Sequence, residues 1–186
     1  MVVLCSGSPR RKSLLESLGV SFTVYKPDID ESRITNELPQ EYTMRLARMK
    51  AEEGASKFPG DVIISADTIV VIDGEILGKP SGREDAVRML KRLSGREHEV
   101  ITGLAVHGHA VHVKAVHTLV KFRALTDEEI SAYVMTGECD DKAGAYAVQG
   151  KGSLLIERIN GDYYNVVGLP LCTLGEILKA ENISIL

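Results

Sequence analysis

Basic residues gather at the start of the first predicted helix, where helices usually carry acidic ones. Residues 2–5 are apolar and predict a short buried strand, after which Ser8 and Pro9 favour a helix start. Residues 10–12 are Arg, Arg and Lys, at the positive end of the helix dipole. Free backbone N–H groups and guanidinium groups meeting there predict an anion site suited to phosphate. A basic helix start that is simply solvated is the alternative.

A second cluster that could do chemistry is acidic. Asp28, Asp30 and Glu31 place three carboxylates within four residues. Hard divalent cations prefer oxygen ligands of this kind, so the cluster could hold a metal ion. A solvated acidic loop explains the same residues equally well.

Asp67 and Thr68 follow the most strand-like run of the chain, residues 61–66. In α/β sheets, ligand-binding groups gather at the carboxyl ends of such strands. A helix N-cap is the usual alternative for Asp-Thr after a strand. That alternative is weak here, because residues 69–72 predict a further strand rather than a helix.

Lys79 stands at the end of a predicted hairpin. Asp73-Gly74 is typical of a type I′ turn, and residues 75–77 predict the returning strand. Lys79 then lies between Gly78 and Pro80, which restrict the backbone of the turn. We expect Asp67 and Lys79, which flank this hairpin, to be able to face one site.

The remaining pattern alternates helices with strands. Helical periodicity predicts helices over residues 39–57, 84–93, 127–135 and 171–180. Strands are predicted over 21–25, 100–106, 111–122 and 154–159, with an extended segment over 163–167. The small residues of 140–150 favour a loop that approaches a ligand closely. His107, His109, His112 and His117 invite a metal interpretation, but without ordered spacing or an accompanying carboxylate we expect them to decorate an exposed hairpin.

Composition limits the class of protein. A chain of 186 residues is long enough for one core, possibly divided into two lobes. The net charge of −4 argues against a nucleic-acid partner, and no apolar run is long enough for a membrane span. Three scattered cysteines predict reduced thiols and a cytoplasmic protein.

Many short motifs, taken in order over nearly the whole chain, resemble the Maf family of nucleoside triphosphate pyrophosphatases. The matching stretches are Ser6-Gly-Ser-Pro-Arg-Arg11, Asp28-Ile-Asp-Glu31, Arg45-Leu-Ala47 with Lys50-Ala51, Ala66-Asp-Thr68, Gly78-Lys-Pro80, Leu93-Ser-Gly95, Thr102-Gly103, Thr136-Gly-Glu138, Asp141 to Tyr146, Gln149-Gly150 and Asn165 to Leu171. The resemblance implies a house-cleaning hydrolase that splits a nucleoside triphosphate into the monophosphate and pyrophosphate.

The resemblance also assigns roles to residues. It makes Asp67 the proton acceptor for the attacking water, although a carboxylate there could equally bind the metal ion, Mg²⁺ or Mn²⁺. Glu31 is then a metal ligand or a partner carboxylate. The triphosphate is expected to bind to Ser6, Arg11, Lys50 and Lys79, with Arg11 acting as a bidentate fork and the lysines as point charges.

Three positions distinguish branches of the family. Arg10, Thr68 and Gln149 resemble the branch that hydrolyses dTTP and UTP, with CTP and modified pyrimidine nucleotides as further candidates. The branch that acts on 7-methyl-GTP differs at all three places. Ala147-Val148 departs from the commoner Gly-Ile of the family, and the added Cβ of Ala147 could stiffen the loop and shift base preference.

By resemblance the fold is α/β, an elongated, strongly twisted mixed sheet flanked by helices. Residues 1–186 would form one Maf-like domain with two lobes around a nucleotide-binding cleft, and a homodimer is possible. The main alternative is a nucleotide-binding regulator of septum formation without turnover. A nucleotidyltransferase would need a more Gly-rich first loop, and an inosine triphosphate pyrophosphatase a different opening motif.

Overall fold

The computed structural model describes residues 1–186, which form a mixed α/β fold built on one seven-stranded sheet. The strands are β1 (Val2–Cys5), β2 (Phe22–Tyr25), β3 (Val62–Ile72), β4 (Glu75–Leu77), β5 (Glu97–His107), β6 (Val111–Phe122) and β7 (Ile156–Asn160). The α-helices are α1 (Pro9–Ser17), α2 (Pro39–Lys57), α3 (Arg83–Leu93), α4 (Asp127–Val134), α5 (Tyr163–Val167) and α6 (Leu171–Ala180). Two 3₁₀ helices are η1 (Ala143–Ala145) and η2 (Gly150–Leu155).

The sheet has the order β2-β1-β3-β5-β6-β7, with β4 paired to β3 off this path. β1 runs parallel to β2 and β3, whereas β3 with β4 and β6 with β7 are antiparallel. The mixed α/β class expected from the resemblance is therefore confirmed. No helix of the chain has both the length and the apolar character needed to cross a membrane.

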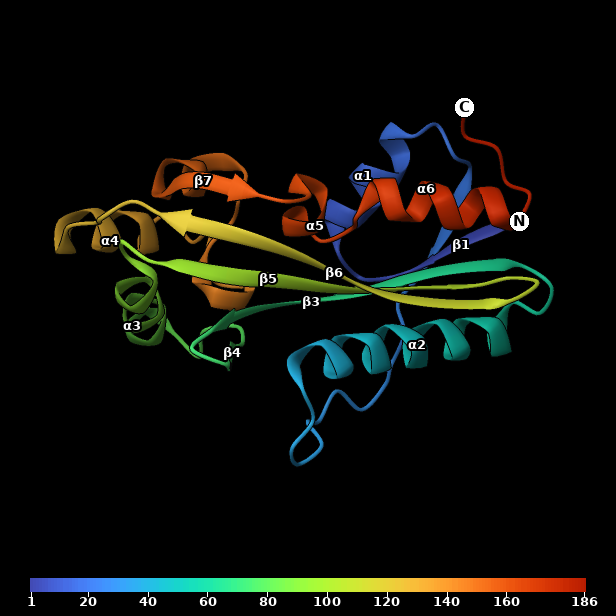
Figure 1. Ribbon diagram of the computed structural model, residues 1–186, viewed down its shortest axis with the longest axis horizontal. Helices are drawn as coiled ribbons and strands as arrows, with labels where there is room; N and C mark the ends of the chain where they lie inside the picture. The colour runs from blue at the N-terminus through green and yellow to red at the C-terminus, as the bar shows by residue number, and fades with distance from the viewer. The chain divides into compact units, whose positions relative to one another are not determined.

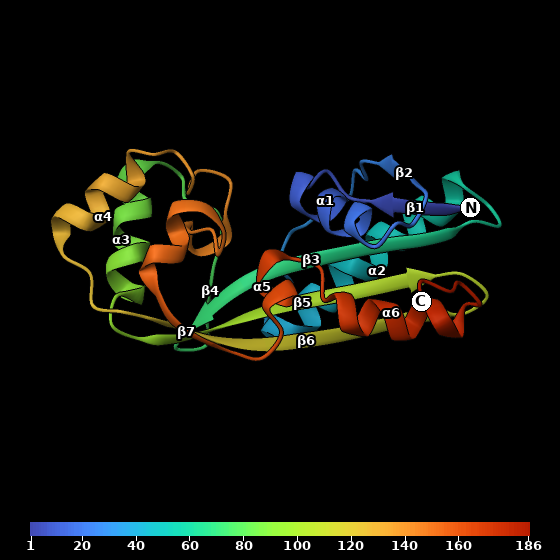
Figure 2. The ribbon, with the colours of Figure 1, turned by 90° about the horizontal axis from the view of Figure 1, so that it is seen from above.

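The chain divides into two compact units. Unit 1 comprises residues 1–67, 102–116 and 168–186, and unit 2 comprises residues 68–101 and 117–167. The long strands β3, β5 and β6 contribute residues to both units. Within unit 1, α2 covers one face of the sheet, and α1 and α6 cover the other (Figure 1). In Figure 2, which is seen from above, α1 and α6 lie nearer the viewer than the sheet of unit 1, and α2 lies behind it.

Two glycines let α2 pack closely on the sheet of unit 1. A Cβ added to Gly54 on α2 would lie 2.2 Å from Cys5 Sγ and 2.7 Å from Ile63 Cγ2. On β5, a Cβ added to Gly103 would lie 2.2 Å from the carbonyl oxygen of Thr43 in α2. The absence of a side chain at both positions therefore sets how near α2 comes to β1, β3 and β5.

The core of unit 2 contains an aromatic cluster. His98, Phe122 and Tyr146 are buried, and their rings meet edge to face with centroids 4.8–5.3 Å apart. The Nε2 of His98 lies 2.8 Å from the Tyr146 hydroxyl, whereas its Nδ1 is buried without a hydrogen-bond partner. Burial lowers the pKa of His98 from 6.5 to about 4. The ring therefore stays neutral in the folded protein at neutral pH.

Local signals for the helices and turns are confirmed. Ser8 is the N-cap of α1 and accepts a hydrogen bond from Arg11 N, and Thr126 and Glu129 form a capping box on α4. α2 and α6 have the predicted bounds. Asp73 and Gly74 have φ values of 55° and 76°, as a type I′ turn requires.

Three local predictions are corrected. β3 is one continuous strand of 11 residues, so Asp67 lies inside it instead of at its carboxyl end. Residues 163–167 form a helical turn rather than an extended segment, because the Asp162 carboxylate accepts hydrogen bonds from Tyr164 N and Asn165 N and caps it. The last strand begins at Ile156, because residues 150–155 form η2.

Candidate active site

The predicted anion site begins where β1 ends. Ser6 is buried, and its Oγ accepts hydrogen bonds from Ser8 N at 3.1 Å and from Arg11 Nη1 at 3.4 Å. The Nε of Arg11 donates to the carbonyl oxygen of Gly168 at 2.7 Å. Two partners from opposite ends of the chain thus fix the guanidinium of Arg11 at the end of β1, beside the first turn of α1.

Arg11 is also tied electrostatically to the predicted carboxylates. Burial lowers its pKa from the ordinary value, and the negative charges of Asp67 and Glu31 oppose that shift, while the neighbouring Arg10 adds to it. Two arginines in the first turn of α1 therefore share one field with two carboxylates. The positive charges of Arg10 and Arg11 repel each other, and a polyphosphate bound beside them would offset that repulsion.

Lys50 joins the two carboxylates that the sequence singled out. Its Nζ lies 2.7 Å from Asp67 Oδ1 and 2.8 Å from Glu31 Oε1. The side chains of Lys50 and Asp67 are 10% and 14% exposed, whereas that of Glu31 is 56% exposed. Lys50 precedes Gly54 by one turn of α2, so the close packing at Gly54 brings the ammonium to β3.

The position of Asp67 follows from the pairing of the parallel strands. Cys5, the last residue of β1, pairs with Ser65 on β3. Asp67 therefore lies two residues beyond the end of that ladder, next to the loop that begins at Ser6. Although β3 continues, its parallel pairing with β1 ends there, and the site still forms at the carboxyl end of paired parallel strands.

The two carboxylates offer oxygen ligands of the kind that divalent cations prefer. No group of three or more His, Cys, Asp and Glu side chains is arranged to hold a metal ion. Mg²⁺ commonly binds through one or two carboxylates and completes its shell with water and substrate phosphates. Lys50 occupies one oxygen of each carboxylate, so Glu31 and Asp67 fit a cation that arrives with the triphosphate rather than an all-protein cage.

Five predicted site residues, all in unit 1, are thus connected: Ser6, Arg11, Glu31, Lys50 and Asp67. Arg10, in the same unit, is partly buried in the first turn of α1. The other three predicted residues belong to unit 2. Thr68 is partly buried on β3, and Lys79 and Gln149 are exposed. That Asp67 and Lys79 face one site stays a prediction.

The segment that carries Gln149 is anchored on both sides. The Tyr133 hydroxyl accepts a hydrogen bond from Ala147 N at 3.0 Å. The Glu138 carboxylate accepts hydrogen bonds from Lys151 N at 3.1 Å and Gly152 N at 3.2 Å. Glu138 lies in the Thr136-Gly-Glu motif, to which sequence reasoning had attached no role.

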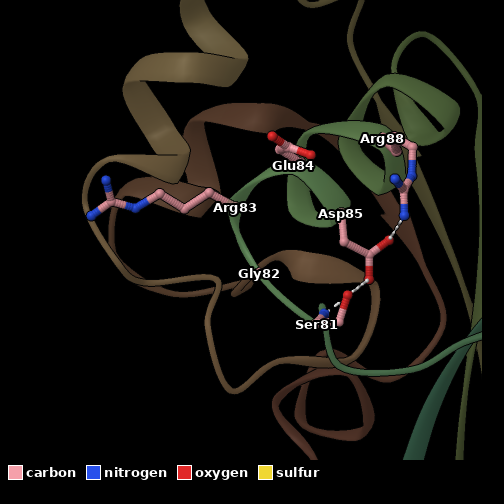
Figure 3. Close-up of a pocket in the computed structure, with 6 residues that line it drawn as sticks. All are labelled: Ser81, Gly82, Arg83, Glu84, Asp85 and Arg88. Carbon is pink, nitrogen blue, oxygen red and sulfur yellow. Dashed lines mark hydrogen bonds and ion pairs between the residues drawn. The ribbon is translucent and has the colours of Figure 1, made fainter.

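A cavity of about 300 Å³ opens at the start of α3 (Figure 3) and contains none of the predicted site residues. Asp85 lines it, and its carboxylate accepts hydrogen bonds from Ser81 N at 2.9 Å and from Ser81 Oγ at 3.1 Å. It also accepts one from Arg88 Nη2 at 2.9 Å. Since a carboxylate already occupies the helix start, this cavity is unsuited to a phosphate.

The histidine hairpin is exposed as expected, with the His109 side chain 80% exposed, but two of its histidines contact a carboxylate. Glu181 is 3% exposed, and its carboxylate lies 3.0 Å from His109 Nδ1 and 2.8 Å from His112 Nε2. It also accepts hydrogen bonds from His109 N and Ala110 N. The expectation that no carboxylate accompanies these histidines is corrected: Glu181, at the end of α6 and about 70 residues away, supplies one.

Sequence reasoning also missed three groups around the predicted site: the carbonyl of Gly168, Tyr42 and Arg45. Tyr42 and Arg45 donate to the backbone of the acidic segment, at Glu31 O and Ser32 O. Gly168 and Arg45 lie within motifs quoted for the resemblance, which was the available signal. For Tyr42, the sequence held no signal beyond its place on the helix.

Comparisons with known proteins show which family this chain belongs to. A family model described as Maf-like protein matches residues 1–181. A relative from Geobacter metallireducens named dTTP/UTP pyrophosphatase is 54% identical over 96% of this chain and 94% of its own. One of the same name from Clostridioides difficile is 48% identical over 96% and 93%.

Solved structures resemble the fold. The Ham1 protein of Staphylococcus aureus aligns with a TM-score of 0.57 at 15% identity, over 97% of this chain and 98% of its own. A HAM1 protein from Coxiella burnetii aligns with a TM-score of 0.52 at 15% identity, over 96% and 98%. At this identity the likeness concerns the fold alone.

Proposed function

Because the chain belongs to the Maf family, we propose that it hydrolyses dTTP and UTP to the monophosphate and pyrophosphate. The observation that carries this proposal is the junction of Lys50 with Asp67 and Glu31, next to the Ser6–Arg11 pair. A partly buried carboxylate, a buried ammonium and a fixed guanidinium are the groups that phosphoryl transfer needs.

In this proposal Asp67 takes the proton from the attacking water. Lys50 holds Oδ1 of Asp67, which orients the carboxylate and leaves Oδ2 to accept the proton. The water oxygen forms a bond to a phosphorus of the α–β anhydride, and the bridging oxygen leaves with the other product. Negative charge grows on the phosphate oxygens, where Arg11 and Lys50 stabilise it.

The residues that would hold Mg²⁺ or Mn²⁺ are Glu31 and, in the alternative in which it binds the ion instead of taking the proton, Asp67. When bound, such an ion would polarise the phosphate oxygens and offset their charge. The chain's own contribution is to orient the two carboxylates, because the ammonium of Lys50 lies between them and contacts both. Ser6 and Lys79 complete the proposed set of triphosphate ligands.

Base preference is proposed to rest on Arg10, Thr68 and Gln149. Thr68 and Gln149 carry both donors and acceptors, as reading the edge of a pyrimidine requires. The names of the relatives support dTTP and UTP as substrates. We also propose a cytoplasmic location, which the three free cysteines support, and a homodimer, which sedimentation analysis would test.

The experiment is product analysis with dTTP, UTP, CTP, GTP and 7-methyl-GTP, each with Mg²⁺ or Mn²⁺. Monophosphate and pyrophosphate from dTTP and UTP, lost in Asp67→Asn, are the expected result. Turnover of 7-methyl-GTP instead would overturn the substrate assignment. Tight nucleotide binding without turnover in the wild type would overturn the enzyme and favour the regulator.

A further inference from the structure

We propose that Tyr42 and Arg45 are positioning residues that hold Glu31 against Lys50 and Asp67. They do so by fastening the acidic loop, residues 26–38, to the first half of α2. This inference rests on the proposed function and deepens it. Tyr42 and Arg45 do not touch the reacting groups, but they position Glu31, a proposed metal ligand.

The acidic loop has no helix or strand of its own. Glu31 lies in the middle of it, and its side chain is 56% exposed. An exposed carboxylate on an irregular segment loses rotamer and backbone freedom when it is fixed, and burial does not compensate that loss here. The contact between Glu31 and Lys50 therefore needs support from the backbone of the loop.

Tyr42 supplies the first support. Its hydroxyl donates to the carbonyl oxygen of Glu31 at 2.9 Å. Burial raises the pKa of Tyr42, and the negative charges of Asp67 and Glu31 raise it further, which places the phenol in the field of the site. Tyr42 and Lys50 both belong to α2, so the same helix holds the backbone of Glu31 and its carboxylate.

Arg45 supplies the second support, at two further points of the loop. Its Nη2 donates to the carbonyl oxygen of Ser32 at 3.0 Å. Its guanidinium also forms a bidentate pair with the Glu37 carboxylate: Nε donates to Oε1 at 2.5 Å, and Nη2 donates to Oε2 at 2.8 Å. The Glu37 side chain is only 7% exposed, and the Arg45 Cζ lies 5.5 Å from the Tyr42 ring centroid.

The chemistry of the fork explains why an arginine is needed. Planar guanidinium matches a carboxylate with two parallel hydrogen bonds and has further donors for a carbonyl oxygen, whereas lysine offers one point charge. Arg45 therefore links Ser32 and Glu37 at once, on either side of the bend in the loop. Glu37 and Arg45 act on Glu31 only through the backbone, which makes them positioning and not catalytic groups.

The test uses Tyr42→Phe, which removes one hydroxyl, and Arg45→Lys, which keeps the charge and removes the fork. Arg48→Lys is the matched control, because Arg48 is on the same helix and pairs only with Glu52, four residues on, in a half-exposed ion pair. Two readouts are measured: kcat and KM for dTTP over a Mg²⁺ titration, and Mn²⁺ affinity by electron paramagnetic resonance with a non-hydrolysable dTTP analogue present.

We expect Tyr42→Phe to weaken Mn²⁺ binding and to raise the Mg²⁺ concentration for half-maximal activity about fivefold, as loss of one hydrogen bond predicts. Arg45→Lys should shift both by about tenfold or more. At saturating Mg²⁺ the kcat of each variant should stay within about threefold of the wild type, and Arg48→Lys should change neither readout.

A double-mutant cycle separates positioning from general stability. In a Glu31→Gln background, Tyr42→Phe should add little, because the carboxylate that it positions is already gone. Full additivity, or unchanged Mn²⁺ affinity in both variants with folding confirmed by circular dichroism, would overturn the inference. If Glu31→Gln and Asp67→Asn themselves leave activity intact, the proposed site has failed instead.

Discussion

The ammonium of Lys50 lies 2.7 Å from Asp67 Oδ1, although Lys50 is on α2 and Asp67 is on β3. Both side chains are largely buried, and the same ammonium also reaches Glu31. Lys50 thus orients both carboxylates, and we propose that the same ammonium also binds the triphosphate. The contact fixes the orientation of the Asp67 carboxylate, which the proposed role as proton acceptor needs.

Replacing Lys50 with methionine keeps most of the volume and removes the charge. We expect kcat/KM for dTTP to fall at least about 100-fold, the usual effect of deleting one charge-stabilising donor in a phosphoryl or acyl transfer site. Steady-state kinetics checks this. Lys114→Met is the control, since Lys114 is exposed on β6 and pairs only loosely with Glu176 at 3.7 Å. Equal effects of the two substitutions would contradict the assignment.

Glu138→Gln tests whether the anchored segment around Gln149 sets base preference. The substitution weakens the hydrogen bonds that Lys151 N and Gly152 N donate to this side chain, so the backbone around Gln149 becomes more mobile. The proposed catalytic groups stay in place. The kcat/KM ratio of UTP to 7-methyl-GTP should fall about tenfold, with kcat for dTTP within about threefold. Glu157→Gln, at an exposed position of β7, is the control. A ratio that moves in Gln149→Ala but stays fixed in Glu138→Gln would refute the anchoring role.

Gly103→Ala tests the close approach of α2 to the sheet. The new Cβ would meet the Thr43 carbonyl oxygen at 2.2 Å, so the helix that carries Lys50 must shift. We expect a loss of about 1–3 kcal/mol in the free energy of unfolding by urea, together with reduced kcat/KM. Gly175→Ala, in α6 with nothing within 4 Å of its added Cβ, should be neutral or slightly stabilising. Matching losses in both variants would argue against the close contact.

His98 should contribute through its protonation to the pH dependence of the free energy of unfolding. Its pKa is about 4 in the folded protein and 6.5 when exposed, so between these values the unfolded chain binds a proton that the native protein does not. Stability therefore falls as pH drops through this window, by about 1.4 kcal/mol per pH unit from this residue.

His98→Gln removes that proton while the other histidines remain. Urea unfolding at pH 7.5 and pH 5 should show a wild-type loss about 2 kcal/mol larger than the loss of the variant. The comparison of slopes is independent of any constant cost of the substitution. If the unfolding free energy depends on pH equally in the wild type and in the variant, the pKa of His98 is not lowered in the folded protein, and the prediction is wrong.

Local rules acting over three or four residues were readable in the sequence. Ser8 with Pro9 predicted the start of α1, the Thr126–Glu129 box predicted α4, and Asp73-Gly74 predicted the turn between β3 and β4. Side chains at such spacing meet regardless of the rest of the chain. The basic residues of the first turn likewise predict an anion from the sequence alone, and that anion site stays a prediction.

Only the tertiary structure decided which distant groups meet. Arg11 contacts the carbonyl of Gly168, 157 positions along the chain, and Glu181 contacts His109, 72 positions before it. Residues 163–167 became helical because Asp162 capped the turn, against their β-forming side chains. The sequence by itself determined which side chains are able to take part in catalysis or binding. Their partners were determined by packing, because a contact between separate elements depends on how close α2, β1 and β3 come, and no local pattern records that distance.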